Sequence, residues 1–433
     1  MRPRPRRGPP ELRVPLRTRV GRLRRSLLRR SWPLARRAAA AYRRTVVART
    51  RVVVVVGSLG KTTTARATAR ALGLRPRGLA ANALGYVARA VLRIRPGQRL
   101  AVIEVGVNKP GQMGLYARLV RPDIVVVTSI ASEHSRSFGS LEAIREEKAT
   151  MVRALPEHGL AVLNGDDEHV LWMATQTRAR VVTFGFGAGN DVRCTEREPD
   201  WPDGSTLTIE SAGERYTVRS RLHGRPAAHA ALAAIAVALA ADVPRGEAVA
   251  RIETLTPGSQ RLQVVALPDG GHLVRDEFKS PSESMEVALD FIAEIPARRR
   301  VVVVGDIADP LGTPAQVYGP LGERIAAVAD LAILVGRSAR RYATGARRAG
   351  MPPEALVLVG PSVHAAIALL EGRIGPGDVV LVKGRDTQRL DRIALALMGR
   401  RVGCAIEICR LPATRRCDGC ELLVHGAGGR AEA

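Results

Sequence analysis

Lysine is the residue type that this sequence most conspicuously lacks. The 433 residues include 67 lysines and arginines, of which only five are lysine and 62 are arginine. The guanidinium group of arginine is planar and permanently charged, whereas the ammonium group of lysine is compact and can lose its proton. We therefore expect lysine mainly where arginine cannot replace it, with retention by chance as the alternative for Lys109 and Lys279. The remaining lysines are Lys61, Lys148 and Lys383.

Long apolar runs and aromatic residues are also scarce. No apolar stretch approaches the roughly 20 residues that a membrane-spanning helix requires, and no continuous apolar segment follows the basic N-terminus as in a signal peptide. We therefore expect a cytoplasmic protein. Aromatic residues make up 3% of the chain and hydrophobic residues 46%, which predicts cores of valine, leucine, isoleucine and alanine. The length suits about three domains of ordinary size.

Acidic residues are outnumbered, and the imbalance is concentrated at the N-terminus. The net charge is +26, of which residues 1–50 carry +16, because they hold 17 arginines and one acid. Apolar residues recur there at helical spacing, at Leu16, Val20, Leu23 and Leu27. This pattern predicts a basic amphipathic helix, which suits an anionic membrane at the inner face of the cell, nucleic acid, or the protein's own acidic surface. Nucleic-acid binding as the main activity is disfavoured, because the tail holds only two aromatic residues for base stacking.

From residue 51 onward, apolar strands alternate with helical segments, which predicts an α/β fold with mostly parallel sheets covered by helices. We expect an arginine-rich tail (1–50), a phosphate-loop-containing central domain (51–257), a second, Rossmann-like α/β domain (258–400) and a cysteine-bearing end (401–433). Expected strands are 52–56, 100–105, 123–129, 159–164 and 180–184, then 272–276, 300–305, 330–335, 355–359 and 378–383. Alternation in 203–222 predicts an antiparallel hairpin, and 227–241 a long alanine-rich helix.

A glycine-rich loop joins the first strand to a helix in the segment VVVVVGSLGKTTTARA. Backbone N–H groups of such a loop and of the helix N-terminus bind phosphate, Lys61 reaches the terminal phosphates, and the Thr62 hydroxyl can bind Mg²⁺. The general pattern has a further glycine where this chain has Val55, so the loop is a shortened version. The segment nevertheless predicts an ATP or GTP site made by Gly57, Ser58, Leu59, Gly60, Lys61, Thr62 and Thr63.

Two residues of types that bind metal ions lie at or after the ends of the next two predicted strands. Glu104 ends the otherwise apolar strand LAVIEV, and His134 comes shortly after DIVVVTSI. Ligands bind at the carboxyl edge of open α/β sheets, which places both side chains near the phosphates. Lys148 follows on the next predicted helix. We expect Thr62, Glu104 and His134 to hold Mg²⁺, although a lone histidine is more often structural.

Cysteine is rare, but four of the five cysteines lie close together at Cys404, Cys409, Cys417 and Cys420. Disulfides are disfavoured in the cytosol, and closely spaced thiols suit a tetrahedral structural Zn²⁺ site. A redox pair or unpaired thiols are the alternative.

Several motifs in order, GSLGKTTT, IEVGVNKPGQM, RPDIVVVTSIASEHSRSFGS, EEKATMV, GLAVLNGDDE, GDIADPLG and LVKGRD, resemble the Mur ligases. These are ATP-dependent amide-bond ligases of cell-wall precursor synthesis. The resemblance extends from about residue 52 to 400 and is strongest to the branch that adds D-alanyl-D-alanine to a UDP-muramoyl tripeptide. It implies an ATP- and Mg²⁺-dependent reaction in which a carboxylate is phosphorylated and the acyl phosphate is then attacked by an amine.

The resemblance also implies roles for single residues. Lys61 and Thr62 would bind phosphates and Mg²⁺, and Glu104 and His134 would be metal ligands. Lys148 would be the lysine that some members carbamylate to gain a further ligand. In the second domain the implied contacts are phosphate through Arg261, nucleotide through Asp276, and substrate through Lys383, Gly384 and Arg385.

Three departures from the family pattern affect the substrate. The family has asparagines where this chain has Ala227 and His229, so His229 is the candidate for the adenine contact. The family's DYNANP stretch has become DEFKSPSES, and only the arginine tail precedes the phosphate loop, where the family has a UDP-sugar-binding domain. A ligase of the poly-γ-glutamate or folylpolyglutamate type is therefore an alternative. A phosphate-loop ATPase whose tail binds nucleic acid or membrane is another.

Overall fold

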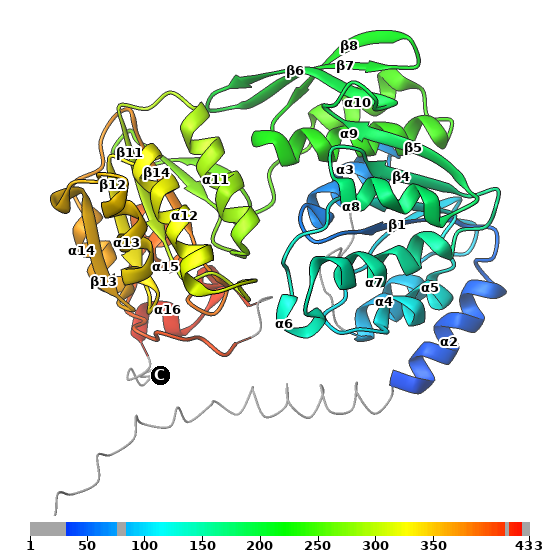
Figure 1. Ribbon diagram of the computed structural model, residues 1–433. Coiled ribbons are helices and arrows are strands. Elements are labelled where there is room, and N and C mark those ends of the chain that lie inside the picture. Colours follow the sequence, from blue (N-terminus) through cyan, green and yellow to red (C-terminus); the bar gives the residue numbers. More distant parts are fainter. Residues whose placement is uncertain (1–31, 76–83, 412–414, 427–433) are drawn as a thin grey trace, which may run out of the picture.

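The computed structural model describes residues 32–75, 84–411 and 415–426, which form two α/β domains side by side (Figure 1). The amphipathic helix predicted around residues 16–27 lies outside the described residues. Within the described part of the chain, no helix is both long and apolar enough to cross a membrane.

The central domain is built on an eight-stranded sheet in the order β2-β1-β3-β4-β5-β6-β7-β8. The strands from β2 to β6 are parallel to their neighbours, and β6, β7 and β8 are antiparallel. The strand bounds are β1 (Arg51–Val56), β2 (Leu100–Glu104), β3 (Ile124–Val127), β4 (Leu160–Asn164), β5 (Arg180–Gly185), β6 (Val192–Asp200), β7 (Gly204–Ser211) and β8 (Glu214–Ser220).

Helices cover both faces of this sheet, because its parallel strands are apolar on both sides. Along β1, Val52, Val54 and Val56 pack into the core beneath α2, α4, α5 and α7, whereas Val53 and Val55 pack beneath α3, α9 and α10. The helix bounds are α2 (Trp32–Arg44), α3 (Lys61–Ala71), α4 (Leu84–Leu92), α5 (Gln112–Val120), α6 (Ser135–Phe138), α7 (Leu141–Arg153), α8 (Glu168–Leu171), η1 (Trp172–Gln176), α9 (Gly224–Ala240) and α10 (Arg245–Glu253).

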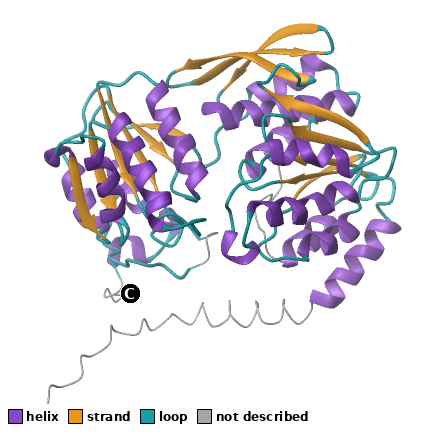
Figure 2. Cartoon of the chain, in the orientation of Figure 1, coloured by secondary structure: helices purple, strands orange, loops and turns teal. Residues whose placement is uncertain are grey.

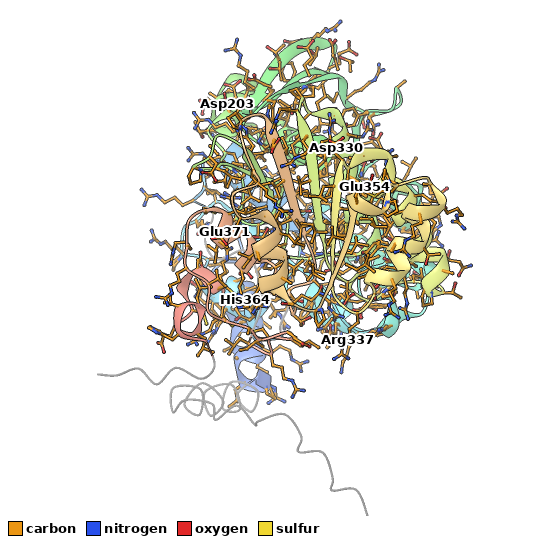
Figure 3. The ribbon with its side chains drawn as sticks, turned by 90° about the vertical axis from the view of Figure 1, so that its left-hand side faces the viewer. Asp203, Asp330, Arg337, Glu354, His364 and Glu371 are labelled. Carbon is orange, nitrogen blue, oxygen red and sulfur yellow. The ribbon has the colours of Figure 1, made fainter. Side chains whose placement is uncertain are left out.

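The C-terminal domain has a six-stranded sheet in the order β13-β12-β11-β14-β10-β9, parallel except for β9. Its strands are β9 (Gln263–Ala266), β10 (His272–Arg275), β11 (Arg299–Val304), β12 (Leu331–Val335), β13 (Leu356–Gly360) and β14 (Asp378–Lys383). Asp330 precedes β12 and Arg337 follows it, so the two labelled side chains mark opposite edges of the sheet (Figure 3). The carboxyl edge therefore lies at the Arg337 end.

Helices sandwich this second sheet as well (Figure 2). They are α11 (Ser282–Glu294), α12 (Pro314–Val328), α13 (Ala339–Arg348), η2 (Pro353–Ala355), α14 (Val363–Leu370) and α15 (Asp391–Leu397), followed by η3 (Cys417–Gly419) and α16 (Leu422–His425). The two short final elements pack against α15 through Leu395, Cys417 and Leu423. The α/β fold with two mostly parallel sheets is thus confirmed.

All ten strands expected from apolar runs are present within two residues of their predicted ends, and so is the hairpin. The long helix is also present, but it begins at Gly224, three residues before its predicted start. Two strands were missed. β6 has the polar sequence VRCTEREPD, and β9 has only four residues at a sheet edge. β6 is rich in polar and charged residues, and β9 is a short edge strand, so neither matched the pattern of a long buried run.

Part of the segment expected to be a tail packs on the central domain. Helix α2 lies against α4 and α5, and Ala39 and Val47 are buried in the core. The Arg43 guanidinium is buried and donates hydrogen bonds to the carbonyl oxygens of Val120 and Arg121, at 2.8 and 3.0 Å, and to Asp123 at 3.1 Å. Residues 32–50 are therefore structurally part of the central domain.

The β6–β8 extension reaches across the top of the molecule to the C-terminal domain (Figure 1). Trp201, after β6, packs with ring centroids 5.1 Å from His272 and 6.2 Å from Phe291. Arg197 also forms an ion pair with Glu294. This extension therefore contacts the C-terminal domain away from the phosphate loop.

Candidate active site at the domain junction

The phosphate loop is held in a conformation that glycine alone permits at its first position. Gly57 has a φ of 143°, and a Cβ atom there would lie 2.0 Å from Thr128 Oγ1. Gly60 also has positive φ, 78°, where the loop meets α3. The buried strand β1 thus ends in a tight turn, and α3 begins at Lys61 with its N-terminus toward the loop. The positive end of the helix dipole and the free N–H groups favour a bound phosphate there.

Residues that directly follow β3 hold the loop in place through hydrogen bonds. The Ser58 hydroxyl donates to the carbonyl of Ala131 at 3.0 Å and accepts from the Ala131 N–H at 2.9 Å. The Leu59 N–H donates to Ser129 Oγ at 3.1 Å, and Thr128 Oγ1 donates to the Leu59 carbonyl at 2.6 Å. These bonds hold the loop in place before any phosphate is present. Thr63 is half-buried on the first turn of α3.

Lys61 lies at the centre of a buried charged cluster. Its ammonium group donates to the Ser58 carbonyl at 2.7 Å and to Glu133 Oε2 at 3.0 Å. Burial alone would raise the pKa of Glu133, but the ammonium groups of Lys61, Lys279 and Lys148 hold it well below its ordinary value. Glu133 is therefore a permanent anion that neutralises the lysines around it. Sequence reasoning missed this residue, although it directly precedes His134.

The structure leaves two predicted metal ligands with free donor atoms. Thr62 Oγ1 donates to Glu104 Oε1 at 3.0 Å, while Glu104 Oε2 is buried and has no hydrogen-bond partner among the described residues. His134 Nε2 is likewise buried and has no hydrogen bond there; it lies 3.6 Å from Glu133 Oε1. Burial lowers the pKa of His134, which favours the neutral, metal-binding imidazole.

A divalent cation fits these free atoms. A buried carboxylate oxygen without a partner is unfavourable unless it is protonated or bound to a cation, and burial indeed raises the pKa of Glu104. Mg²⁺ typically takes one or two carboxylates and completes its shell with water and substrate phosphates. Thr62 and Glu104 suit such a site beside the phosphate loop, with His134 as a further donor.

Lys148, on α7, is buried and donates to Ser58 Oγ at 2.5 Å. Burial, followed by the repulsion of Lys61, lowers its pKa to about 7. A substantial neutral fraction at physiological pH follows. Arginine could not provide such a fraction, which accounts for a lysine at this position in a chain that otherwise uses arginine.

The C-terminal domain supplies the other side of the site. Arg261 stacks on the Phe278 ring at 4.6 Å, and burial lowers its pKa while the Glu104 carboxylate acts in the opposite direction. Lys383, at the end of β14, is 1% exposed and bonds to Asp276 and to the Lys279 carbonyl. Lys383 is therefore engaged inside the domain, and its predicted substrate contact would have to replace these bonds.

Polar contacts near the site join the domains. Lys279 forms an ion pair with Glu133, and the Ser132 N–H and hydroxyl donate to the Glu283 carboxylate at 2.7 and 2.8 Å. Ser135, the first residue of α6, donates to the Asp309 carbonyl at 2.7 Å. Figure 1 shows α6 at the face that meets the C-terminal domain. Lys279 thus extends the Lys61–Glu133 cluster across the junction, a role that its sequence context did not reveal.

Other predicted residues lie apart from this cluster. His229, on α9, forms a 2.8 Å contact between its Nε2 and Asp166 and packs edge-on to Phe186 at 5.2 Å. Arg385 is half-buried after β14, and its Nε has no partner among the described residues. At Gly384 a Cβ atom would lie 2.5 Å from Leu390 Cδ1, so this glycine allows close packing.

The predicted zinc site is not supported. Across residues 32–75, 84–411 and 415–426, no three His, Cys, Asp or Glu side chains are grouped to hold a metal ion. Cys417 is buried against Asp391, and Cys404 Sγ lies 3.5 Å from the Arg392 guanidinium. Cys404 and Cys417 both lie beside α15, and the Cys404 N–H donates to the Leu423 carbonyl at 3.1 Å.

Comparison with known proteins places this geometry in a family. Residues 55–238 match the Mur ligase middle domain, and residues 260–385 match the Mur ligase, glutamate ligase domain. The UDP-N-acetylmuramoyl-tripeptide–D-alanyl-D-alanine ligase of Mycobacterium bovis is 30% identical over 372 residues, covering 80% of this chain and 72% of the relative. The Escherichia coli enzyme of that name is 31% identical over 60% of this chain, which spans 58% of that relative's length.

Solved structures agree with the sequence comparison. MurF from Acinetobacter baumannii is similar with a TM-score of 0.73 and 25% identity, covering 84% of this chain and 81% of that one. A folylpolyglutamate synthase from Mycobacterium tuberculosis shares the fold, with a TM-score of 0.61 and 15% identity, covering 85% of this chain and 95% of that one. With the phosphate loop and both family domains in order, the chain belongs to the Mur ligase family.

Proposed function

We propose that the protein is an ATP-dependent ligase that joins a carboxylate to an amine through an acyl phosphate, acting on a cell-wall-related precursor. One observation carries the proposal. The phosphate-loop lysine Lys61, the free donors of Glu104 and His134, and Lys279 of the second domain all meet at the domain junction. Such a site can hold ATP on one domain and present a second substrate from the other.

The proposed reaction has two steps. A carboxylate oxygen of the acceptor attacks the γ-phosphorus of ATP, and the bond to the β–γ bridging oxygen breaks to release ADP. The amine nitrogen then attacks the acyl carbon, the carbon–oxygen bond to phosphate breaks, and the nitrogen loses a proton. The products are an amide, ADP and inorganic phosphate.

The chain's own residues would assist by position and charge. The loop N–H groups and Lys61 would bind the β- and γ-phosphates, and Lys61 would neutralise charge on the transferring group. Bound Mg²⁺, held by Thr62 and Glu104 with His134, would supply further charge neutralisation. Lys148, in its neutral form, is available for the carbamate that the family resemblance implies. The contacts across the junction would exclude water from the acyl phosphate.

Isotope transfer tests the mechanism directly. With an acceptor whose carboxylate carries ¹⁸O at both oxygens, the full chain should release inorganic phosphate that contains one ¹⁸O atom per amide formed. ADP formation should require the acceptor. Phosphate without ¹⁸O in the presence of amide product would overturn the acyl-phosphate route. ATP hydrolysis stimulated by nucleic acid alone, with no amide formed, would favour the ATPase alternative instead.

The names of the relatives also suggest which substrates the enzyme joins. The curated relatives are named for UDP-N-acetylmuramoyl-tripeptide and D-alanyl-D-alanine, and we propose a related carboxylate acceptor and an amino-acid or dipeptide donor. Folate and glutamate would be the pair for the folylpolyglutamate alternative. Product analysis by mass spectrometry with each pair separates the two.

We also propose that the basic N-terminal segment attaches the enzyme to the inner face of the membrane. Its support is the charge of +16 on residues 1–50 and the spacing of apolar residues in it. Electrostatic attraction to anionic lipid and burial of an apolar stripe act together in such segments.

A further inference from the structure

A pocket of about 650 Å³ lies along the free edge of β2, outside the nucleotide loop. Strand β2 is the first strand of the sheet order, so one of its edges has no neighbouring strand among the described residues. The pocket is bordered by the end of α3 on one face of the sheet and by α4 on the other. Its volume lies within the range of sites for small organic ligands.

The pocket connects the active site to the opposite edge of the sheet. Its lining follows β2 from the residues that precede it, including Gln98, to Glu104 at its carboxyl end. Arg75, after α3, and Arg93 and Arg95, after α4, line it at the amino edge of the sheet, where these helices end. Five strand residues span on the order of 13 Å between the first and last Cα atoms. An elongated ligand could therefore contact the arginines and Glu104 at once.

The pocket is strongly positive. Four arginines line it, namely Arg75, Arg89, Arg93 and Arg95, and Glu104 is the only acid among its described lining residues. Within the described part of the chain none of these guanidinium groups forms an ion pair, whereas Arg43, Arg153 and Arg251 on neighbouring elements each do. Among the described lining residues only Glu104 offsets this positive charge.

We infer that this pocket is an anion-binding subsite that holds a phosphate group of the carboxylate acceptor. Guanidinium groups bind phosphate through paired N–H donors, and several of them can share its oxygens and charges. The half-exposed Tyr86 on α4 adds an aromatic wall. The acceptor phosphate binds at the arginines, and the rest of the molecule extends along β2 toward Glu104. Its role as acceptor site rests on the proposed ligase function, whereas phosphate binding does not.

Binding of inorganic pyrophosphate tests the site in the full chain. A saturating complex of Mg²⁺ with a non-hydrolysable ATP analogue blocks the phosphate loop, and calorimetry then measures pyrophosphate binding at the second site. We expect the double variant Arg89→Gln/Arg93→Gln to bind at least about tenfold more weakly than the wild type, because two charge-assisted contacts are lost. Binding should also weaken as salt is raised.

A charge-matched control removes two exposed arginines elsewhere. Arg178 and Arg215 lie on the surface, outside the pocket lining, so Arg178→Gln/Arg215→Gln should bind pyrophosphate like the wild type. Circular dichroism and binding of the ATP analogue confirm that each variant is folded. Equal weakening in both double variants, or no pyrophosphate binding by the nucleotide-loaded wild type, would overturn the subsite.

The phosphate could come from a soluble or a lipid-linked acceptor, and competition distinguishes these sources. Displacement of pyrophosphate by a nucleoside diphosphate indicates a soluble acceptor. Displacement by vesicles that carry phosphatidic acid, lost in the pocket variant but not in the control, indicates a lipid-linked one. Displacement by neither would overturn the assignment of the pocket to the acceptor.

Kinetics separate failure of this inference from failure of the proposed function. With an active acceptor, the pocket variant should raise the KM for acceptor at least about tenfold and leave the KM for ATP unchanged. Ligation with an unchanged acceptor KM would contradict the inference while the ligase function stands. Pyrophosphate binding without any ligase activity would contradict the function while the anion site stands.

Discussion

Gly57 has the strictest steric requirement in the phosphate loop. Its φ of 143° lies in a region that side chains rarely adopt, and Thr128 Oγ1 occupies the place of a Cβ atom. The loop can approach the end of β3 this closely only without a side chain. Close approach in turn lets Thr128, Ser129 and Ala131 bond to the loop and orient its N–H groups.

We predict that Gly57→Ala weakens ATP binding by at least about tenfold and destabilises the fold by more than about 1 kcal/mol, because both strain and a clash are introduced. Titration with a fluorescent ATP analogue and chemical unfolding measure the two effects. Gly246→Ala is the control, because Gly246 has open space around it and no positive φ. Wild-type affinity in the Gly57 variant would show that the loop does not bind the phosphates.

Lys148 gives a second prediction at this scale. Lys148→Arg should retain the fold and ATP binding but lose ligation by on the order of 10²-fold, because a permanently charged guanidinium cannot become a carbamate and enters a cluster that already holds Lys61. Removal of bicarbonate should lower wild-type activity in the same direction. The exposed Lys109 supplies the matched control, Lys109→Arg, which should ligate normally. Normal ligation by the Lys148 variant would remove this residue from the active site.

At the scale of elements, α2 separates the described fold from the basic segment before it. The helix is anchored by the buried Arg43 and by Ala39 in the core, so its removal would expose apolar surface of α4 and α5. The boundary for a clean truncation is therefore residue 31 rather than the end of the arginine-rich region at residue 50.

We predict that deletion of residues 1–31 preserves ATP binding and thermal stability but weakens binding to anionic vesicles at least about tenfold. The deleted segment contributes most of the charge that attracts the lipid, and α2 remains to cover the core. Vesicle sedimentation at low and high salt measures the effect, with neutral vesicles as the control. Unchanged binding after the deletion would contradict membrane attachment through this segment.

At the scale of the whole molecule, the domains meet at the active site and again at the β6–β8 extension. His223, at the start of α9, lies between Trp201 and Phe291, with ring centroids 6.1 and 5.4 Å away. Burial lowers its pKa from 6.5 to about 4, although Asp203, labelled in Figure 3, opposes the shift. The junction therefore contains a histidine that must stay neutral.

This histidine should make stability depend on pH. Between pH 6.5 and about 4 the unfolded chain binds a proton that folded His223 does not, so its contribution to stability is complete above pH 6.5 and falls as pH drops toward 4. The loss amounts to on the order of 2–3 kcal/mol. Urea unfolding across this range should show a shallower pH dependence for His223→Phe than for the wild type. Parallel pH profiles would contradict this account.

Much of the architecture follows from the sequence alone, because its signals are local. A buried parallel strand such as 52–56 needs a continuous apolar run, and a phosphate loop needs glycines, a lysine and a threonine at fixed spacing. Glu104 and His134 were placed correctly at one edge of the sheet because parallel strands bring their carboxyl ends together. These features depend on residues that are close in the chain.

Only the tertiary structure decided which distant charges meet. Glu133 and Lys279 have 145 residues between them, and their ion pair requires the second domain to lie against the first. The pocket along β2 likewise depends on two helix ends that flank one strand edge. Conversely, the four cysteines near the C-terminus are neighbours in sequence, but among the described residues no three metal-binding side chains are grouped there. Local patterns specify elements, whereas long-range pairing depends on how the faces of those elements pack, and no short motif encodes that.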